Sequence, residues 1–165
     1  MPITKEQLIG LCGEGHLYHV AQVGSWTKIQ EHGLRSTSAL LDRFEISVKV
    51  RFELESQHRP ASRRVFHPLH GEVTIRDQRP LNEAMLGHCL EECTPEQFYR
   101  LLNERVFFWL TFARAAGMIK AYRGCEHDLL TIDAKRFIDA YVGRVELSRL
   151  NSGAARSVDH KRGLD

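Results

Sequence analysis

The sequence predicts an α+β domain in which a small split sheet, mixed or antiparallel, has helices inserted between its strands. Three observations support this class. The apolar runs of strand length are short, helix-start signals stand between them, and the expected helices are too brief for a series of full parallel crossovers. A doubly wound parallel sheet, whose strands read as long Val/Ile-rich runs, is therefore not expected.

Capping residues mark where the helices begin. Thr94 is followed by Pro95 at the first helical position and by Gln97 at the third, which forms a capping box. Gly33 is positioned to end an earlier helix in the left-handed conformation. The expected helices follow Thr4, Ser25, Ser38 and Thr94, span roughly 112–122, and run from Asp133 to about Tyr141.

Short apolar runs predict the strands, and one of these runs is ambiguous. Residues 44–54 alternate strictly between apolar and polar side chains, and this period of two favours a half-buried strand. Phe44, Val48 and Phe52 in the same run are also four residues apart, so a helix stays open as the alternative. The other expected strands are 17–20, 72–76, 106–110, 129–132 and 145–147.

Length and composition indicate a soluble protein with one ordinary core. The 165 residues are 42% hydrophobic and 27% charged. We expect a single domain over 1–150 and a polar segment over 151–165 that packs on it or trails from it. No apolar run is long enough to span a membrane and no secretory signal opens the chain, so we expect a cytoplasmic protein with no membrane contact. Four cysteines without a CxxC pair indicate reduced thiols.

Charge and metal-ligand patterns give no strong functional signal. The net charge of +2 is too small to predict nucleic-acid binding, and we expect the basic group Arg59, Arg63 and Arg64 on a solvated face. His67 and His70 have the spacing of a metal-binding pair, but no cysteine or carboxylate stands nearby at zinc-site spacing, so no metal is expected. The P-loop, dinucleotide-binding, nucleophile-elbow and HExxH motifs are absent from the sequence.

Polar residues at the ends of apolar runs form the candidate site. Buried polar groups need partners, so their concentration at strand ends indicates a cleft. His19 stands out because it lies inside the first apolar run and precedes a turn and a helix. Taken alone, it is either a packed core histidine or a histidine that orients a ligand. The set comprises His19, Ser36, Thr37, Arg76, Asp77, Gln78, Asn103, Arg105 and Asn151.

Five segments carry resemblances to known families. They are Leu17-Tyr18-His19-Val20 before a helix, His32-Gly33-Leu34-x-Ser36-Thr37, Ile75-Arg76-Asp77-Gln78-x-Pro80, Leu102-Asn103-x-Arg105-Val106-Phe107-Phe108-Trp109, and Asn151-Ser152-Gly153. The first two resemble the opening of the ADP-ribosyltransferase fold, as in the DNA-targeting toxins of that superfamily. More closely, nearly the whole chain resembles an uncharacterised bacterial domain family related to that fold.

The resemblance implies NAD as the substrate and assigns residues to it. His19 would hold the ribose region of NAD, and Phe107 or Trp109 would pack against the nicotinamide. Arg76 or Arg51 would meet the pyrophosphate. The full set of implied NAD-binding residues is Tyr18, His19, Ser36, Thr37, Arg76, Phe107 and Trp109.

The third motif of the superfamily departs from its usual pattern here. A glutamate normally stands on a late strand, where the matching segment offers Glu146, which comes early, or Asn151 in place of the acid. With His19, these two are the implied catalytic residues. A carboxylate stabilises a developing positive charge and acts as a base, whereas an amide only orients. A different base, such as Asp77, is another possibility.

Three functions follow from these expectations. The first is an NAD-dependent ADP-ribosyltransferase that modifies a nucleic acid or a protein. The second is a non-catalytic relative that binds NAD, ADP-ribose or a nucleotide terminus. The third is a structural interaction domain in which the polar set is a buried network of Arg76, Asp77, Asn103 and Arg105. The oligomeric state stays open.

Overall fold

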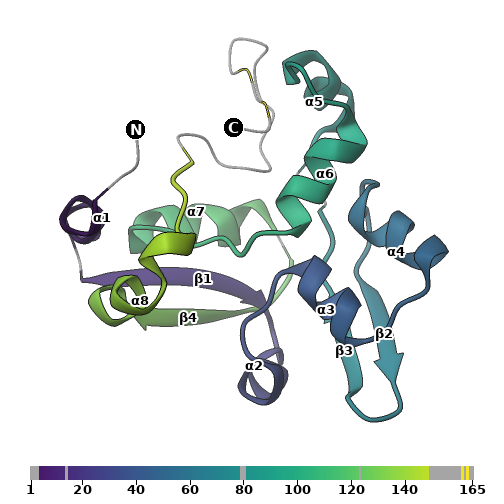
Figure 1. Cartoon of the computed structure of the whole chain (residues 1–165), viewed down its shortest axis with the longest axis horizontal. Helices are drawn as coiled ribbons and strands as arrows, with labels where there is room; N and C mark the ends of the chain where they lie inside the picture. The colour runs from purple at the N-terminus through teal and green to yellow at the C-terminus, as the bar shows by residue number, and fades with distance from the viewer. Residues whose placement is uncertain are drawn as a thin grey trace. The chain divides into compact units, whose positions relative to one another are not determined.

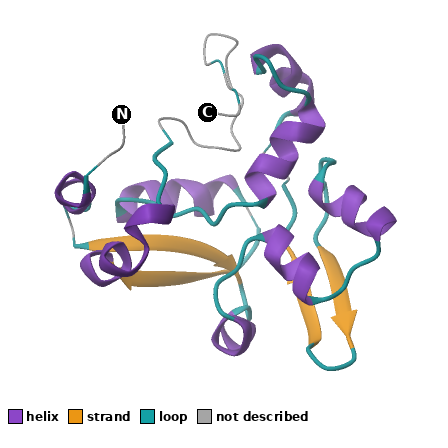
Figure 2. Cartoon of the chain, in the orientation of Figure 1, coloured by secondary structure: helices purple, strands orange, loops and turns teal. Residues whose placement is uncertain are grey.

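The fold is of the expected α+β class. The computed structural model contains, in the residues it describes, eight α-helices, one 3-10 helix and four β-strands (Figure 1). The strands form two separate two-stranded antiparallel sheets, drawn in orange in Figure 2, so the sheet is split as expected. The described residues are 4–13, 15–78, 81–122, 124–148, 161 and 163.

The chain divides into two compact units, and each has its own hydrophobic clusters. The first unit is formed by two separate stretches of the chain, which bracket most of the second. The units comprise residues 1–26 with 107–148, and residues 27–106 with 149–165.

The first unit is built around a two-stranded sheet. β1 (His16–Gln22) pairs antiparallel with β4 (His127–Asp133), and Leu17 lies opposite Ile132. Both strands occur where the apolar runs predict them. The helices of this unit are α1 (Lys5–Leu11), α7 (Phe112–Ala121), α8 (Ala134–Tyr141) and the 3-10 helix η1 (Val142–Arg144).

Helices cover both faces of the β1–β4 sheet. Successive side chains of a strand project to opposite faces. Leu17 therefore packs in a cluster with residues of α1 and with Ile138 of α8, whereas Tyr18 packs with Ala115 of α7 on the other face. This alternation determines which side chains of β1 can meet one another in a site.

The segment before α7 makes one isolated backbone bridge to β1. Trp109 forms an isolated antiparallel bridge with Tyr18, whose backbone N–H and C=O exchange hydrogen bonds of 2.9 and 2.8 Å with it. The buried strand predicted for 106–110 is thus wrong, because these residues are half-buried and make one bridge. The strand predicted for 145–147 is also wrong, since no strand is found there.

The second unit contains a hairpin covered by helices. β2 (Arg63–His67) and β3 (Gly71–Ile75) pair antiparallel with Val65 opposite Val73, and both valines pack in one core with Leu54. A second cluster lies between the two later helices. The helices are α2 (Trp26–His32), α3 (Thr37–Arg43), α4 (Val48–Glu55), α5 (Glu83–Cys89) and α6 (Pro95–Asn103).

The strand favoured over residues 44–54 is wrong, and the helical alternative is correct. Most of this run forms α4. The apolar residues of the run are not buried together, because Val48 and Phe52 are 86% and 50% exposed while Leu54 is 2% exposed. The alternating pattern therefore does not correspond to a buried face.

We predict that replacement of Ser36 by alanine lowers the free energy of unfolding by about 1 kcal/mol. The Ser36 hydroxyl accepts a hydrogen bond of 3.2 Å from the amide of Ala39 and so caps α3. Ser47 occupies the same position before α4 but makes no side-chain capping bond. Ser47→Ala is therefore the matched control and should change stability by less than about 0.5 kcal/mol in urea denaturation. Equal effects of the two substitutions would contradict the prediction.

Candidate functional site

The ring of His19 is fixed by the backbone of the segment that precedes α7. His19 Nδ1 lies 2.8 Å from the carbonyl oxygen of Phe107. A carbonyl oxygen only accepts, so Nδ1 carries the proton and donates it, and in the neutral ring Nε2 is then the acceptor. His19 is half-buried on β1. The sequence alone left it either a core residue or a ligand-orienting residue, and a defined tautomer is compatible with both roles.

A row of aromatic rings extends from His19 through the first unit. The centroid of Phe108 lies 5.8 Å from that of His19 and 4.9 Å from that of Phe137 in α8. Phe137 in turn lies 5.1 Å from Tyr141, and the guanidinium of Arg144 lies 5.9 Å from the Tyr141 centroid. These contacts support the His19 ring on the face of the sheet that α8 covers.

Tyr18 and Trp109 belong to the other face of the sheet. Both lie in the cluster built around Ala115 of α7, and the Tyr18 ring meets the edge of Phe112 at a centroid distance of 6.0 Å. The two aromatic candidates for the nicotinamide therefore differ. The Phe107 carbonyl contacts His19, whereas Trp109 packs with Tyr18.

The other predicted site residues are distributed over both units. Glu146 is exposed and follows η1 in the first unit. Ser36 and Thr37 begin α3 in the second unit, where Ser36 serves as the helix cap. Arg76 follows β3 in the same unit, and Asn151 lies outside the described residues. The roles of these five residues in NAD binding or catalysis stay predictions.

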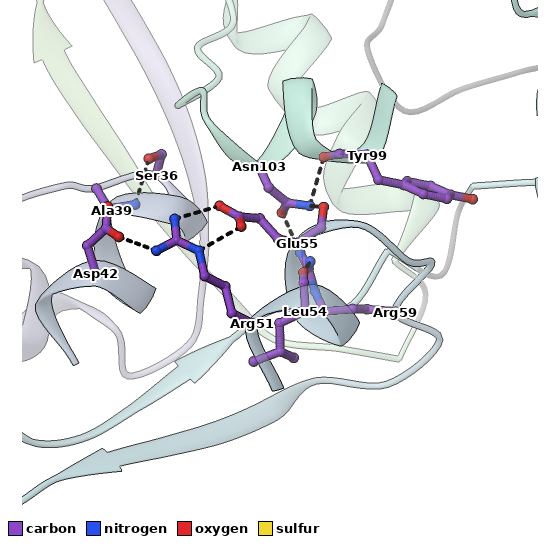
Figure 3. Close-up of polar contacts among 9 residues, drawn as sticks. All are labelled: Ser36, Ala39, Asp42, Arg51, Leu54, Glu55, Arg59, Tyr99 and Asn103. Carbon is purple, nitrogen blue, oxygen red and sulfur yellow. Dashed lines mark hydrogen bonds and ion pairs between the residues drawn. The ribbon is translucent and has the colours of Figure 1, made fainter. Parts of the chain in front are cut away.

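The second unit holds a buried polar network around Arg59 (Figure 3). Only 6% of Arg59 is exposed. Its Nε donates to the carbonyl of Arg76 at 3.1 Å, one terminal nitrogen donates to the carbonyl of Leu54, and the other donates to Asn103 Oδ1 at 3.0 Å. The expectation of a solvated basic face is correct for Arg63 and Arg64, which are exposed, but wrong for Arg59.

Asn103 is the centre of the hydrogen bonding in this network. Its Oδ1 accepts from Arg59, and its Nδ2 donates to the carbonyls of Glu55 and Tyr99 at 3.0 and 2.9 Å (Figure 3). Asp77 is also buried, and its carboxylate accepts from the hydroxyl of Ser62 at 3.0 Å. Asn103 and Asp77 were both in the polar set expected from the sequence, but Arg59 was not.

Glu55 is a buried carboxylate held by an arginine of its own helix. Its two oxygens accept from Nε and a terminal nitrogen of Arg51 at 2.8 and 3.1 Å, and Arg51 also pairs with Asp42 (Figure 3). Burial raises the pKa of the Glu55 carboxyl, but the hydrogen bonds and the positive charge of Arg51 outweigh it and hold the pKa below its usual value. Arg51, an implied pyrophosphate ligand, thus has two carboxylate partners.

Two further classes of site have no support in the described part of the chain. Among residues 4–13, 15–78, 81–122, 124–148, 161 and 163, no three His, Cys, Asp or Glu side chains are placed to share a metal ion. No helix of that part is long and apolar enough to cross a bilayer.

We predict that Asn103→Ala lowers the free energy of unfolding by about 3 kcal/mol. The substitution removes an acceptor from the buried guanidinium of Arg59 and a donor from two buried carbonyls. Chemical denaturation measures the effect. Arg64→Ala is the control, because Arg64 is exposed and pairs with Glu72 only at 3.5 Å, so it should cost less than about 1 kcal/mol. A similar loss in both variants would rule out the network as the cause.

We predict that Glu55 makes the protein sensitive to acid below about pH 4.5. The pKa of Glu55 is lower in the folded protein than its ordinary value of 4.5, so its stabilising contribution is complete above that value. The contribution is lost as the pH falls through the folded-state pKa. Urea midpoints measured from about pH 6 to about pH 3 should therefore fall less steeply in Glu55→Gln than in the wild type.

The exposed Glu72→Gln is the control for this titration and should keep the wild-type slope. The slopes are compared, and not the absolute stabilities, because Glu55→Gln also weakens the pairing with Arg51 at every pH. A Glu55→Gln slope equal to that of the wild type would contradict the assignment.

Comparison with known proteins places the chain in a family. No curated protein and no solved structure matches it. The model described as "Family of unknown function (DUF7002)" matches residues 15–165, which include both sheets. This match agrees with the expected likeness to an uncharacterised family and carries no link to the ADP-ribosyltransferases. The chain belongs to the family of unknown function DUF7002.

Proposed function

We propose that the protein binds NAD and acts as an ADP-ribosyltransferase on a nucleic acid or protein acceptor. The observation that carries this proposal is the hydrogen bond of 2.8 Å between His19 Nδ1 and the Phe107 carbonyl. It fixes the orientation and the tautomer of a half-buried histidine on the first strand, at the position that the resemblance assigns to the ribose of NAD. A ring held in this way is preorganised for a ligand.

The chemistry of His19 fits a ribose. With Nδ1 donating to the protein, Nε2 of the neutral ring accepts a hydrogen bond, and a ribose hydroxyl is a donor. NAD would supply an ADP-ribosyl group, since cleavage of its ribose–nicotinamide bond releases nicotinamide and the acceptor's nucleophile takes its place. The chain would bind and orient NAD, and a base would take the proton of the acceptor.

Glu146 is the described acid that best suits the third motif. It is exposed in the first unit, the same unit that carries His19. The proposal places the protein in the bacterial cytoplasm, where NAD is abundant. The four free cysteines fit a reducing compartment.

A non-catalytic NAD- or ADP-ribose-binding domain is the second candidate. The observation that favours it is the amide of Asn151 at the sequence position where the superfamily has its acid. An amide orients a ligand but does not act as a base. This candidate shares the His19 site with the first and differs from it only in the absence of nicotinamide release.

We predict that NAD raises the melting temperature of the protein and binds with a heat signal in calorimetry, and that His19→Ala abolishes both effects. The loss is expected because the substitution removes the side chain that the proposal assigns to the ribose. His16→Gln is the matched control, since His16 is an exposed histidine on the same strand, and it should bind NAD as the wild type does. Binding that survives in His19→Ala would overturn the proposed site.

Nicotinamide release separates the two candidates. Slow release from NAD by the wild type, and its loss in Glu146→Ala or Asn151→Ala, is the result expected for a transferase. NAD binding without release favours the binding domain. Release that is unchanged in both variants would show that the third motif is placed wrongly. Neither binding nor release would leave the structural interaction domain as the interpretation.

A further inference from the structure

Three histidine rings gather around Phe44 in the second unit. The His67 and His70 rings are stacked at a centroid distance of 4.6 Å, and the His70 ring meets the edge of the His32 ring at 5.6 Å. All three rings also contact Phe44, at centroid distances of 5.6–6.2 Å. His32 ends α2, Phe44 directly follows α3, and His67 ends β2 before the turn that contains His70, so the cluster joins α2, α3 and the β2–β3 hairpin.

Two of these rings accept hydrogen bonds that only a deprotonated nitrogen can accept. His32 Nδ1 accepts from Nε of Arg43 at 3.3 Å, and His67 Nδ1 accepts from the amide of Leu69 at 3.2 Å. A proton on either Nδ1 would place two N–H groups against each other and remove the bond. Both bonds hold the cluster together, because the first joins α2 to α3 and the second closes the turn. The cluster in its present form is thus the neutral one.

The charges that face the cluster are mostly positive. Arg43 on α3 bonds to His32, and Arg35 in the next loop donates to the His32 carbonyl at 2.5 Å. Lys28 on α2 lies 3.5 Å from the His70 carbonyl. The two acids that face the cluster are Glu31 on α2, 3.5 Å from His32, and Glu45 after α3, 3.7 Å from His67. Glu31 is shared with Lys28, which it contacts at 2.6 Å.

Added protons are therefore poorly accommodated at this place. His32 is almost completely buried, and its Nε2 makes no hydrogen bond, although a carboxylate oxygen of Glu31 lies 3.5 Å from it. Desolvation lowers the pKa of His70, and the charges of Arg43, His67 and His32 add to this effect. A histidine with a lowered pKa stabilises the fold above its ordinary value of 6.5, and the stabilisation is lost as the pH falls through the folded-state pKa.

We propose that His32, His67 and His70 form a pH-sensitive latch that holds α2 and the β2–β3 turn against α3 at neutral pH and releases them in acid. Protonation removes the Arg43–His32 and Leu69–His67 bonds and brings like charges to within ring-contact distance. Histidine is suited to this role because its charge changes between pH 5 and 8. The segment released includes α2, which follows β1 and its His19 after a short turn. The latch does not depend on the proposed NAD binding.

Hydrogen–deuterium exchange of the full chain tests the latch. Exchange is measured at about pH 7.5 and about pH 5.5, and each rate is divided by the intrinsic rate of the unfolded chain at that pH. We expect peptides covering α2 and residues 67–71 to lose about tenfold in protection at the lower pH. Peptides of α6, in the same unit but outside the cluster, should change little and serve as the internal reference. Equal protection at the two pH values in all of these peptides would overturn the proposal.

The variant His32→Asn/His67→Asn makes the test specific. Asparagine offers an oxygen near the position of Nδ1 but does not titrate, so the two accepted bonds are kept and their pH dependence is removed. We expect α2 and the turn to stay protected at the lower pH in this variant. His88→Gln, at an exposed histidine of α5, is the control and should respond as the wild type does. A wild-type pH response in the double variant would also overturn the latch. If the double variant does not fold, the single variant His70→Gln takes its place in the same exchange experiment, with the same expected and contradicting results.

Discussion

The second unit depends on the solvation of one buried charge. Arg59 is permanently charged and 6% exposed, so a set of acceptors must replace the water that it loses. The protein supplies two backbone carbonyls, Leu54 and Arg76, and the side chain of Asn103. The Leu54 carbonyl lies in the last turn of α4, where carbonyls have no partner within the helix. One arginine thus donates hydrogen bonds to a carbonyl at the end of α4, to a carbonyl directly after β3 and to the side-chain amide of Asn103, the last residue of α6. It therefore connects the ends of these three elements.

In the first unit, the two faces of the sheet separate the candidate residues from one another. Because helices cover both faces of β1 and β4, neighbouring side chains on β1 enter different environments. His19 joins the aromatic row with Phe108, whereas Tyr18 joins Trp109 beside α7. The ring of His19 is held by the backbone carbonyl of Phe107 in the segment before α7. His19 and the adjacent Tyr18 thus belong to different packing environments, although they follow one another in the sequence.

Local signals in the sequence predicted the helix starts well, and tertiary effects account for what was missed. Thr94 and Thr4 cap helices as expected, because a cap depends only on residues within one turn. Residues 44–54 matched both a strand period and a helix spacing, and the tertiary structure favours the helix although Val48 ends up 86% exposed. The buried role of Arg59 has no sequence signature, since two of its partners are backbone carbonyls. β2 was not predicted either. It begins with two exposed arginines and buries a single valine, so it lacks the apolar run by which a strand is recognised.

The response of the second unit to acid differs between Arg59, Glu55 and the histidine cluster. Arg59 keeps its charge at every accessible pH, so its network does not titrate. The pKa of Glu55 is held below its ordinary value of 4.5, and the pKa of His70 is held below its ordinary value of 6.5. The proposed latch acts through the histidine rings, whereas Glu55 pairs with Arg51 of its own helix, so the two responses to acid have separate structural origins. A local opening that leaves the rest of the unit folded distinguishes a regulatory device from simple acid denaturation.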